Sequence, residues 1–277
     1  MAFLRVVEVL PPLFPASGGG HDHIRTGEAM ERFAREVAGA RGVADVILVA
    51  NVKDLNRLKF DSVHAAAMLQ QDSNLRAAPV VVVRDQNRPQ FLSTVLTGIS
   101  LGLGAMMIAW GDDYPESSRA SNVHDFPSLA GAIREASRIR SRARSSMQFF
   151  APVDLESLAY QRGVALAKER LAVGADLLLA QPPTTDAGQA FDRHDALLEG
   201  SALKGRVLPN VFHFKDEGDL RGYERMFGWR LPKEVHLAAT GGERELAELE
   251  RKVVRRLRSE EYPGVYLSTR GNPSVAK

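Results

Sequence analysis

Residues 155–181, LESLAYQRGVALAKERLAVGADLLLAQ, decide the fold class. Gly174 divides the segment, because glycine readily adopts the left-handed conformation that ends a helix. An apolar run at 175–180 follows at once and predicts a buried strand. Before it, apolar residues recur every seven positions in two series, which we expect on one buried helix face: Leu158, Ala165 and Ala172, and Ala159, Leu166 and Val173. A helix that leads directly into a buried strand is one unit of a parallel α/β sheet.

The same unit recurs along the whole chain. Eight apolar runs are spaced by roughly 35 residues, close to the length of a strand with its crossover helix. They are 3–9, 45–50, 79–83, 105–110, 147–151, 175–180, 206–212 and 264–269. Eight units predict a closed (β/α)8 barrel, a TIM barrel, formed by residues 1–277 as a single domain. An open doubly wound sheet uses the same local units and is the alternative.

Composition excludes several classes of function. The 277 residues include 36 Lys plus Arg against 34 Asp plus Glu, so no basic excess favours nucleic acid. Cysteine is absent, which removes disulfides, thiol nucleophiles and thiolate metal sites. The most apolar stretch, 95–110, is shorter than the roughly 20 residues of a membrane span. We therefore expect a cytoplasmic protein without a membrane partner, and a homo-oligomer is compatible with the sequence.

The end of the first predicted strand carries the leading catalytic candidate. In a parallel barrel, catalytic groups project from the carboxyl ends of the strands. Leu4, Val6 and Glu8 share one strand face because side chains alternate, and only Glu8 is polar. A carboxyl group among apolar neighbours has a raised pKa, which suits it to donate a proton near neutral pH. A structural ion pair with an arginine is the alternative.

Two other strand ends add polar groups. Trp110, Gly111 and Asp112 follow the fourth strand, where glycine lets a ligand approach the backbone and Asp112 can hold a donor-rich heterocycle. Gln181 ends the sixth strand, and its amide both donates and accepts hydrogen bonds, as the edge of a pterin or flavin ring requires. Capping of a turn by Asp112, and of loop backbone by Gln181, are the structural alternatives.

The remaining polar clusters give weaker predictions. Arg84 and Asp85 follow the third strand, where an anion can meet a helix N-terminus, or the two can form a structural pair. His21 and His23 are at most a fragment of a metal site, so no metal is expected. The arginines between 134 and 144, and those between 251 and 258, are interpreted mainly as solvated helix faces.

Taken in order, these segments resemble the methylenetetrahydrofolate reductase family of (β/α)8 barrels. The resemblance covers nearly the whole chain. It lies in VVEVLPP at 6–12, RDQNR at 84–88 followed by the apolar strand and Gly111 with Asp112, GAD at 174–176 with Gln181, and GVY at 264–266.

The resemblance implies an oxidoreductase of one-carbon metabolism and methionine biosynthesis. It would reduce the methylene bridge of methylenetetrahydrofolate, or of a related tetrahydropterin, to a methyl group. By position, Glu8 resembles the acid that protonates the bridge nitrogen. Asp112 resembles the aspartate that contacts the pterin, and Gln181 the amide that seats the substrate. We expect a cofactor near Arg84, Asp85, Trp110 and Gly111.

The cofactor prediction has two forms. The family commonly passes hydride from NAD(P)H through FAD, but Val80 and Val82 stand where it often has His and Thr against the flavin. Direct transfer from NAD(P)H is therefore the alternative to FAD. Two other functions stay open: a barrel methyltransferase that passes a methyl group from methyltetrahydrofolate to a corrinoid protein, and a non-catalytic folate-binding barrel.

Overall fold

Parallel strands form the centre of the molecule in the computed structural model, which describes residues 2–15, 23–51, 57–111, 123–154, 161–181, 188–227 and 230–268. Each strand pairs in parallel with its neighbours, and the last pairs with the first. The strands are β1 (Leu4–Val9), β3 (Val46–Val49), β5 (Arg76–Val82), β7 (Ala105–Ala109), β9 (Gln148–Asp154), β10 (Leu177–Gln181), β11 (Val207–Leu208), β12 (Asn210–Phe212) and β13 (Gly264–Ser268). All eight predicted runs are thus confirmed as strands of this sheet.

The sheet closes into a barrel at Pro209. This residue separates β11, which pairs with β10, from β12, which pairs with β13. The carbonyl oxygen of Pro209 accepts a hydrogen bond of 2.9 Å from the backbone nitrogen of Tyr266. Proline has no N–H for the ladder, and it lies where the strand changes partner. β11 and β12 are therefore two parts of one seventh strand, and the predicted (β/α)8 barrel is confirmed.

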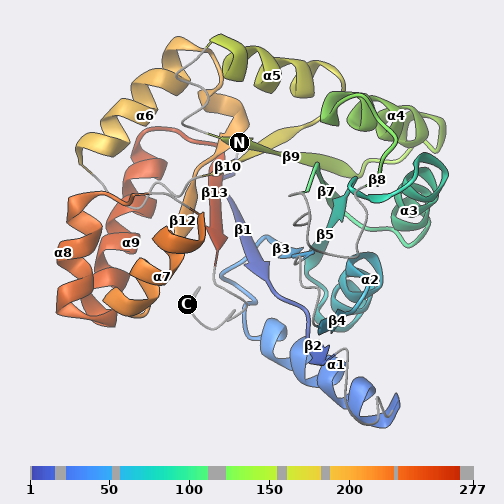
Figure 1. Ribbon diagram of the computed structural model, residues 1–277, viewed down its shortest axis with the longest axis horizontal. Helices are drawn as coiled ribbons and strands as arrows, with labels where there is room; N and C mark the ends of the chain where they lie inside the picture. Colours follow the sequence, from blue (N-terminus) through green and yellow to red (C-terminus); the bar gives the residue numbers. More distant parts are fainter. Residues whose placement is uncertain are drawn as a thin grey trace.

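Helices surround the barrel, as Figure 1 shows. They are α1 (His23–Ala38), α2 (Ser62–Ser73), α3 (Arg88–Ser100), α4 (Leu129–Arg142), α5 (Gln161–Ala172), α6 (Gln189–Gly200), α7 (Glu217–Phe227), α8 (Lys233–Gly241) and α9 (Glu243–Ser259). Two short strand pairs lie outside the barrel: β2 (Leu13–Pro15) with β4 (Arg57–Lys59), and β6 (Asp85–Gln86) with β8 (Val123–His124). None of the helices in the described part of the chain is long and apolar enough to cross a membrane.

The core has two layers because the side chains of each strand alternate. Val6, Leu48 and Met107 belong to the cluster inside the barrel. Val7 and Ile47, one position away, belong to the cluster between the strands and the helices. The interior is thus filled along most of its length, and polar side chains of the same face come only at the carboxyl ends of the strands.

The buried face of α5 differs from the prediction. Ala165 and Ala172 are exposed and Leu166 is 38% exposed, whereas Gly163 and Ala167 are buried. Val164, Leu171 and Val173 also pack against the core, so Val173 is the residue of the two series that joins this face within the described part of the chain. Leu158 and Ala159 lie outside the described residues. Gly174 has φ +121°, as its predicted role at the end of the helix requires.

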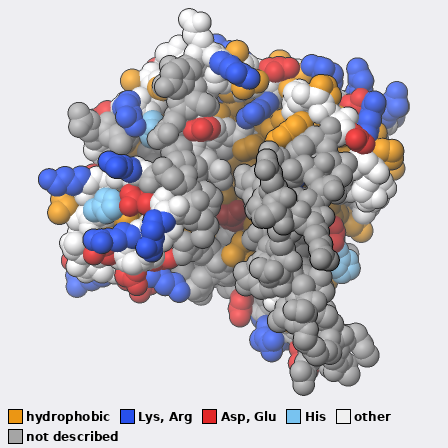
Figure 2. All heavy atoms as spheres, viewed as in Figure 1, with side chains coloured by type: hydrophobic (Ala, Val, Ile, Leu, Met, Phe, Trp, Pro, Cys, Tyr) orange, Lys and Arg blue, Asp and Glu red, His pale blue; other side chains and the backbone are white. Residues whose placement is uncertain are grey.

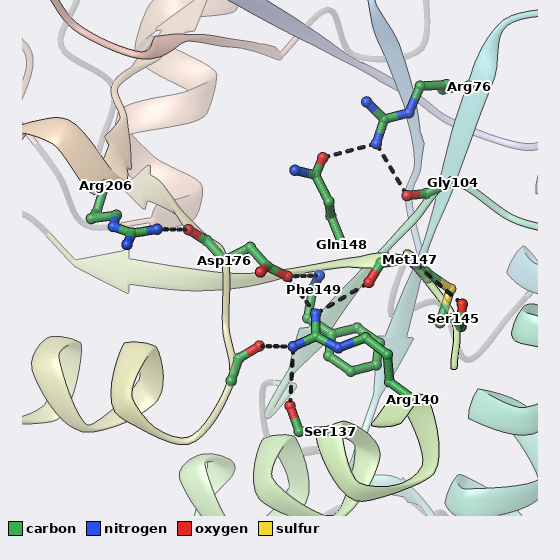
Figure 3. Close-up of polar contacts among 11 residues, drawn as sticks. Arg76, Gly104, Ser137, Arg140, Ser145, Met147, Gln148, Phe149, Asp176 and Arg206 are labelled. Atoms are coloured by element: carbon green, nitrogen blue, oxygen red, sulfur yellow. Dashed lines mark hydrogen bonds and ion pairs between the residues drawn. The ribbon is translucent and has the colours of Figure 1, made fainter. Parts of the chain in front are cut away.

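Arg140 of α4 corrects the interpretation of its arginines as solvated. Its Nη1 donates hydrogen bonds to Asp176 Oδ2 at 2.6 Å and to the Met147 carbonyl at 3.1 Å. Its Nη2 donates to the Gly174 carbonyl at 3.1 Å. Figure 3 shows the guanidinium joining α4 to the starts of two strands, with Phe149 beside it. Arg140 therefore links α4 to the amino-terminal ends of β9 and β10, at the end of the barrel opposite to the predicted site.

Candidate active site

A cavity of about 430 Å³ opens at the carboxyl ends of the barrel strands. Its lining comes from seven of the eight barrel strands and the turns that follow them: Glu8, Leu10, Ala50, Asn51, Val80, Val82, Arg84, Met107, Ala109, Trp110, Gly111, Pro152, Gln181 and Tyr266. In Figure 2, hydrophobic and acidic side chains are visible between the grey atoms near the middle of the face. The volume is within the range of small-molecule sites in proteins.

Glu8 lies in the wall of this cavity with its side chain partly buried. Ser268 Oγ donates a hydrogen bond of 2.6 Å to Glu8 Oε2, and the Tyr266 side chain also hydrogen bonds to Glu8. Burial raises the pKa of Glu8 above its ordinary value, and the hydrogen bonds from Ser268 and Tyr266 oppose this only in part. The carboxyl group can therefore hold a proton and deliver it into the cavity.

Tyr266 and Ser268 are site residues that the sequence analysis missed. The Cα register pairs Val6 with Tyr266 and Glu8 with Ser268, so their side chains share the inner face. Burial, followed by the nearby Glu8 charge, raises the pKa of Tyr266 well above its ordinary value, so its hydroxyl stays protonated. The alternation of Gly264, Tyr266 and Ser268 along the eighth strand is the sequence signal that indicates this face.

Asn210 is a further buried polar residue on the inner face. It is 2% exposed and pairs in register with Tyr266. Its Oδ1 is buried and has no hydrogen-bond partner within the described part of the structure. A buried oxygen without a hydrogen-bond partner destabilises the fold. Asn210 therefore places an unsatisfied hydrogen-bond acceptor in a largely apolar interior. No pattern in the sequence distinguishes it from a loop asparagine beside Pro209.

Arg84, Trp110 and Gly111, which the sequence analysis expects near a cofactor, line the same cavity. Arg84 is 1% exposed, and its backbone nitrogen donates to the Trp110 carbonyl at 3.0 Å. Gly111 has φ +89°, and a Cβ there would lie 2.3 Å from Val82 Cγ1. Its glycine is thus required by close packing against the neighbouring strand as well as by its backbone conformation.

The other predicted residues have different outcomes. Gln181 is exposed at the end of β10 and lines the cavity with Glu8. Asp112 lies outside the described residues, as does His21. The backbone of Asp85 forms β6, which is separate from the barrel sheet. The structure therefore brings five predicted residues, Glu8, Arg84, Trp110, Gly111 and Gln181, to one cavity.

One wall of the cavity is apolar where the resemblance places flavin contacts. Val80 and Val82 of β5 and Met107 of β7 form it. Valine side chains offer no hydrogen bond to the polar edge of an isoalloxazine ring. These residues do not fit the flavin contacts of the family. Among the described residues there is also no group of three or more His, Asp and Glu side chains arranged to hold a metal ion.

Comparisons with known proteins identify a fold. No protein-family model matches the chain, and no curated protein matches it in sequence. The predicted resemblance to methylenetetrahydrofolate reductases therefore remains a prediction.

Solved structures do match. An uncharacterized protein from Clostridium thermocellum that binds two copies of 5-methyl-5,6,7,8-tetrahydrofolic acid superposes with a TM-score of 0.66 at 10% identity, over 99% of this chain and 94% of that one. A 2,3-dimethylmalate lyase, of the PEP mutase/isocitrate lyase superfamily, gives 0.54 at 15% identity, over 96% and 75%. An oxaloacetate acetylhydrolase gives 0.54 at 12%, over 99% and 76%. At these identities, the likeness shows that the chain has the α/β-barrel fold.

Proposed function

We propose that this chain binds a reduced folate, or another tetrahydropterin, in the Glu8 cavity and reduces its methylene bridge to a methyl group with hydride from NAD(P)H. The observation that carries the proposal is the position of Glu8. A carboxyl group with a raised pKa lies in the wall of a small-molecule cavity at the catalytic end of a barrel. This is the arrangement that a general acid needs.

The proposed reaction begins with proton transfer from Glu8. The proton moves to a bridge nitrogen of methylenetetrahydrofolate, the bond between that nitrogen and the one-carbon unit breaks, and an iminium ion forms. Hydride from NAD(P)H adds to the iminium carbon and leaves a methyl group and NAD(P)⁺. Water then returns a proton to Glu8. Without the first step the one-carbon unit is a poor electrophile, so the acid controls the rate.

Other residues have positioning roles in this proposal. Gln181 hydrogen bonds to the pterin edge. Asp112 lies outside the described residues, and its contact with the pterin is only what the resemblance implies. Trp110, Arg84 and Gly111 lie toward the nicotinamide and hold it against the one-carbon unit. Val80, Val82 and Met107 provide an apolar surface for a flat ring. Because that wall does not fit a flavin, no step is assigned to FAD, and hydride transfer is direct.

The Clostridium thermocellum barrel supports a folate ligand, because its fold resembles this one over nearly the full length of both chains and it binds 5-methyltetrahydrofolic acid. The same ligand also favours a second candidate function. Methyltetrahydrofolate is the product of the proposed reduction and equally the donor for a methyltransferase. Consumption of NAD(P)H separates the two functions, since methyl transfer to a corrinoid needs none.

The test compares the wild-type protein with Glu8→Gln, which keeps the shape of the side chain and removes its acid. We expect Glu8→Gln to bind 5-methyltetrahydrofolate within about twofold of wild type by calorimetry and to lose at least about 100-fold in kcat for methylenetetrahydrofolate-dependent NAD(P)H oxidation. Glu199→Gln, at an exposed glutamate of α6, is the matched control and should keep full activity. Near-normal reduction by Glu8→Gln would show that the acid is assigned wrongly. Methyl transfer by wild type without nicotinamide would favour the methyltransferase.

A further inference from the structure

A second cavity lies on the other side of strand β13 from Glu8. It has a volume of about 330 Å³ and lies between α9 and the outward faces of β12 and β13. Val265 and Leu267 of β13 face this cavity, whereas the Tyr266 side chain belongs to the barrel interior. Ser268 also lines the second cavity, although its Oγ hydrogen bonds to Glu8. The two cavities are therefore separated by one layer of strand. The proposed reaction uses none of the side chains described below.

The floor of this second cavity is apolar. Val211, Val254 and Val265 line it, and Leu267 beside them is partly exposed. Ala247 of α9 contributes only a methyl group, which leaves room between the helix and the strands. An apolar floor of this size suits a ring system or a short hydrocarbon chain.

Four arginines line the same cavity: Arg5, Arg251, Arg255 and Arg258. Among the described residues of the lining, Glu250 is the only acidic one. Arg5 pairs with Asp45, at 3.1 Å between Nε and Oδ2.

The cationic rim is only partly neutralised. The Nη2 atoms of Arg251 and Arg255 lie 2.9 and 3.0 Å from the carboxylate of Glu248, so two guanidinium groups share one counter-charge. Both arginine side chains are more than half exposed and can turn toward a ligand. The rim therefore retains a positive excess that attracts an anion.

A buried histidine at one end of the cavity is held by an acidic partner. His213 is 8% exposed, and its Nδ1 lies 2.9 Å from Glu250 Oε1. Its Nε2 is buried and has no hydrogen-bond partner among the described residues, and the nearest carboxylate oxygen, of Glu243, is 3.9 Å away. Burial raises the pKa of Glu250 in spite of this contact. The pair fixes the histidine ring while one nitrogen stays unsatisfied.

We propose that this cavity is a binding site for a small amphipathic anion, an apolar ring system that carries a carboxylate, sulfonate or phosphate group. The rings occupy the valine-lined floor, and the anionic group lies at the rim between Arg251 and Arg255. The proposal is independent of the folate site.

The experiment uses two dyes that share their rings and differ in charge. The probe is 8-anilinonaphthalene-1-sulfonate, and the neutral comparison is N-phenyl-1-naphthylamine. Fluorescence titrations are made with wild type, with Ala247→Trp, which fills the cavity, and with the double variant Arg251→Gln/Arg255→Gln. Ala165→Trp, at an exposed alanine of α5, is the matched control for an added indole.

We expect wild type and Ala165→Trp to bind the sulfonate equally, at one dye per chain in this site, and Ala247→Trp to lose this binding. The double arginine variant should weaken sulfonate binding at least about tenfold, which is roughly 1.4 kcal/mol, and should change binding of the neutral dye less than about twofold. Because both arginines are exposed, this variant tests the proposal even where Ala247→Trp fails to fold.

Three results would overturn the proposal. Sulfonate binding that survives in folded Ala247→Trp would place the dye elsewhere, for example in the Glu8 cavity. If the double arginine variant weakens the binding of both dyes equally, the arginines do not recognise the anionic group. Light scattering tests a third possibility. If the wild type is a dimer that binds no dye and Ala247→Trp is a monomer, this cavity is occupied by a second copy of the chain.

Discussion

Ser268 Oγ lies 2.6 Å from Glu8 Oε2, although the two residues are 260 positions apart in the chain. The pairing of β13 with β1 places them opposite one another on the inner face of the barrel. Glu8 receives this hydrogen bond only when the last strand completes the barrel beside the first. The protonation of the candidate acid therefore depends on barrel closure as well as on local burial.

Removal of this hydroxyl should change the pH dependence of catalysis. The hydrogen bond from Ser268 favours the charged form of Glu8 and lowers its pKa against the larger effect of burial. In Ser268→Ala the pKa of Glu8 therefore rises further. A general acid acts in its protonated form, so activity falls as pH rises through this pKa. We expect the falling limb of kcat/KM against pH to move to higher pH in Ser268→Ala.

The control for this prediction is Ser201→Ala, which removes a serine that hydrogen bonds to the Leu198 carbonyl at the end of α6. Its profile should match that of wild type. A limb that moves to lower pH in Ser268→Ala would contradict the assigned hydrogen bond. An unchanged limb would mean that the limb reports a group other than Glu8.

Glu8 should also make stability depend on pH. Its folded-state pKa is raised above its unfolded value, so the stabilisation from the protonated form is complete below the unfolded pKa and is lost as pH rises through the folded one. Glutamine does not titrate. The free energy of unfolding of wild type, minus that of Glu8→Gln, should therefore decrease as the pH rises above the ordinary pKa of glutamate. Urea denaturation at a series of pH values measures this difference, and one that stays constant or grows would rule out the raised pKa.

The sequence predicted those parts of the site that depend on one strand at a time. Glu8 and Gln181 end apolar runs, and the rule that barrel sites lie at such ends brought them together correctly. Tyr266 and Ser268 depend on which strands are neighbours and in which register they pair. That information comes only from closure, which itself occurs at Pro209 through a change of partner that no local pattern predicts.

Helix faces were harder to predict than strands for a related reason. In a strand, the alternation of side chains shows from its own residues which of them share a face. Which face of a helix is buried depends on the elements packed against it. Ala167 of α5 is buried and Leu166 is 38% exposed, although leucine is the more apolar of the two. Arg140 donates hydrogen bonds to carbonyl groups outside its own helix. The sequence of α4 does not show which of its arginines has such partners.

Gly111 should tolerate no larger residue. Its φ of +89° is strained for any other residue, and an added Cβ would meet Val82 Cγ1 at 2.3 Å. We expect Gly111→Ala to lower the free energy of unfolding by about 3 kcal/mol, the sum of backbone strain and overpacking. Gly102→Ala has a positive φ but open space around the added Cβ, so it should cost only about 1 kcal/mol.

A double variant separates the two causes at Gly111. With Val82→Ala, the contact at 2.3 Å disappears, so Gly111→Ala should cost less in that background than in wild type. Urea denaturation of the four proteins of the cycle gives the coupling. If the cost is the same in both backgrounds, the backbone conformation alone explains the glycine.

At the opposite end of the barrel, Arg140→Ala should destabilise the fold without changing the chemistry. The substitution removes donors from Asp176 Oδ2 and from the Met147 and Gly174 carbonyls, and it removes the guanidinium beside the Phe149 ring. We expect a loss of about 3 kcal/mol in the free energy of unfolding, because partly buried acceptors lose charged partners. Arg142→Ala, at an exposed arginine two residues away on α4, should change stability by less than about 0.5 kcal/mol.

Ligand affinity at the Glu8 cavity, measured by calorimetry on the folded fraction, should be the same in both variants. Equal stability of the two variants would show that Arg140 is solvated like its neighbours, and a selective loss of affinity in Arg140→Ala would show that the two ends of the barrel are coupled.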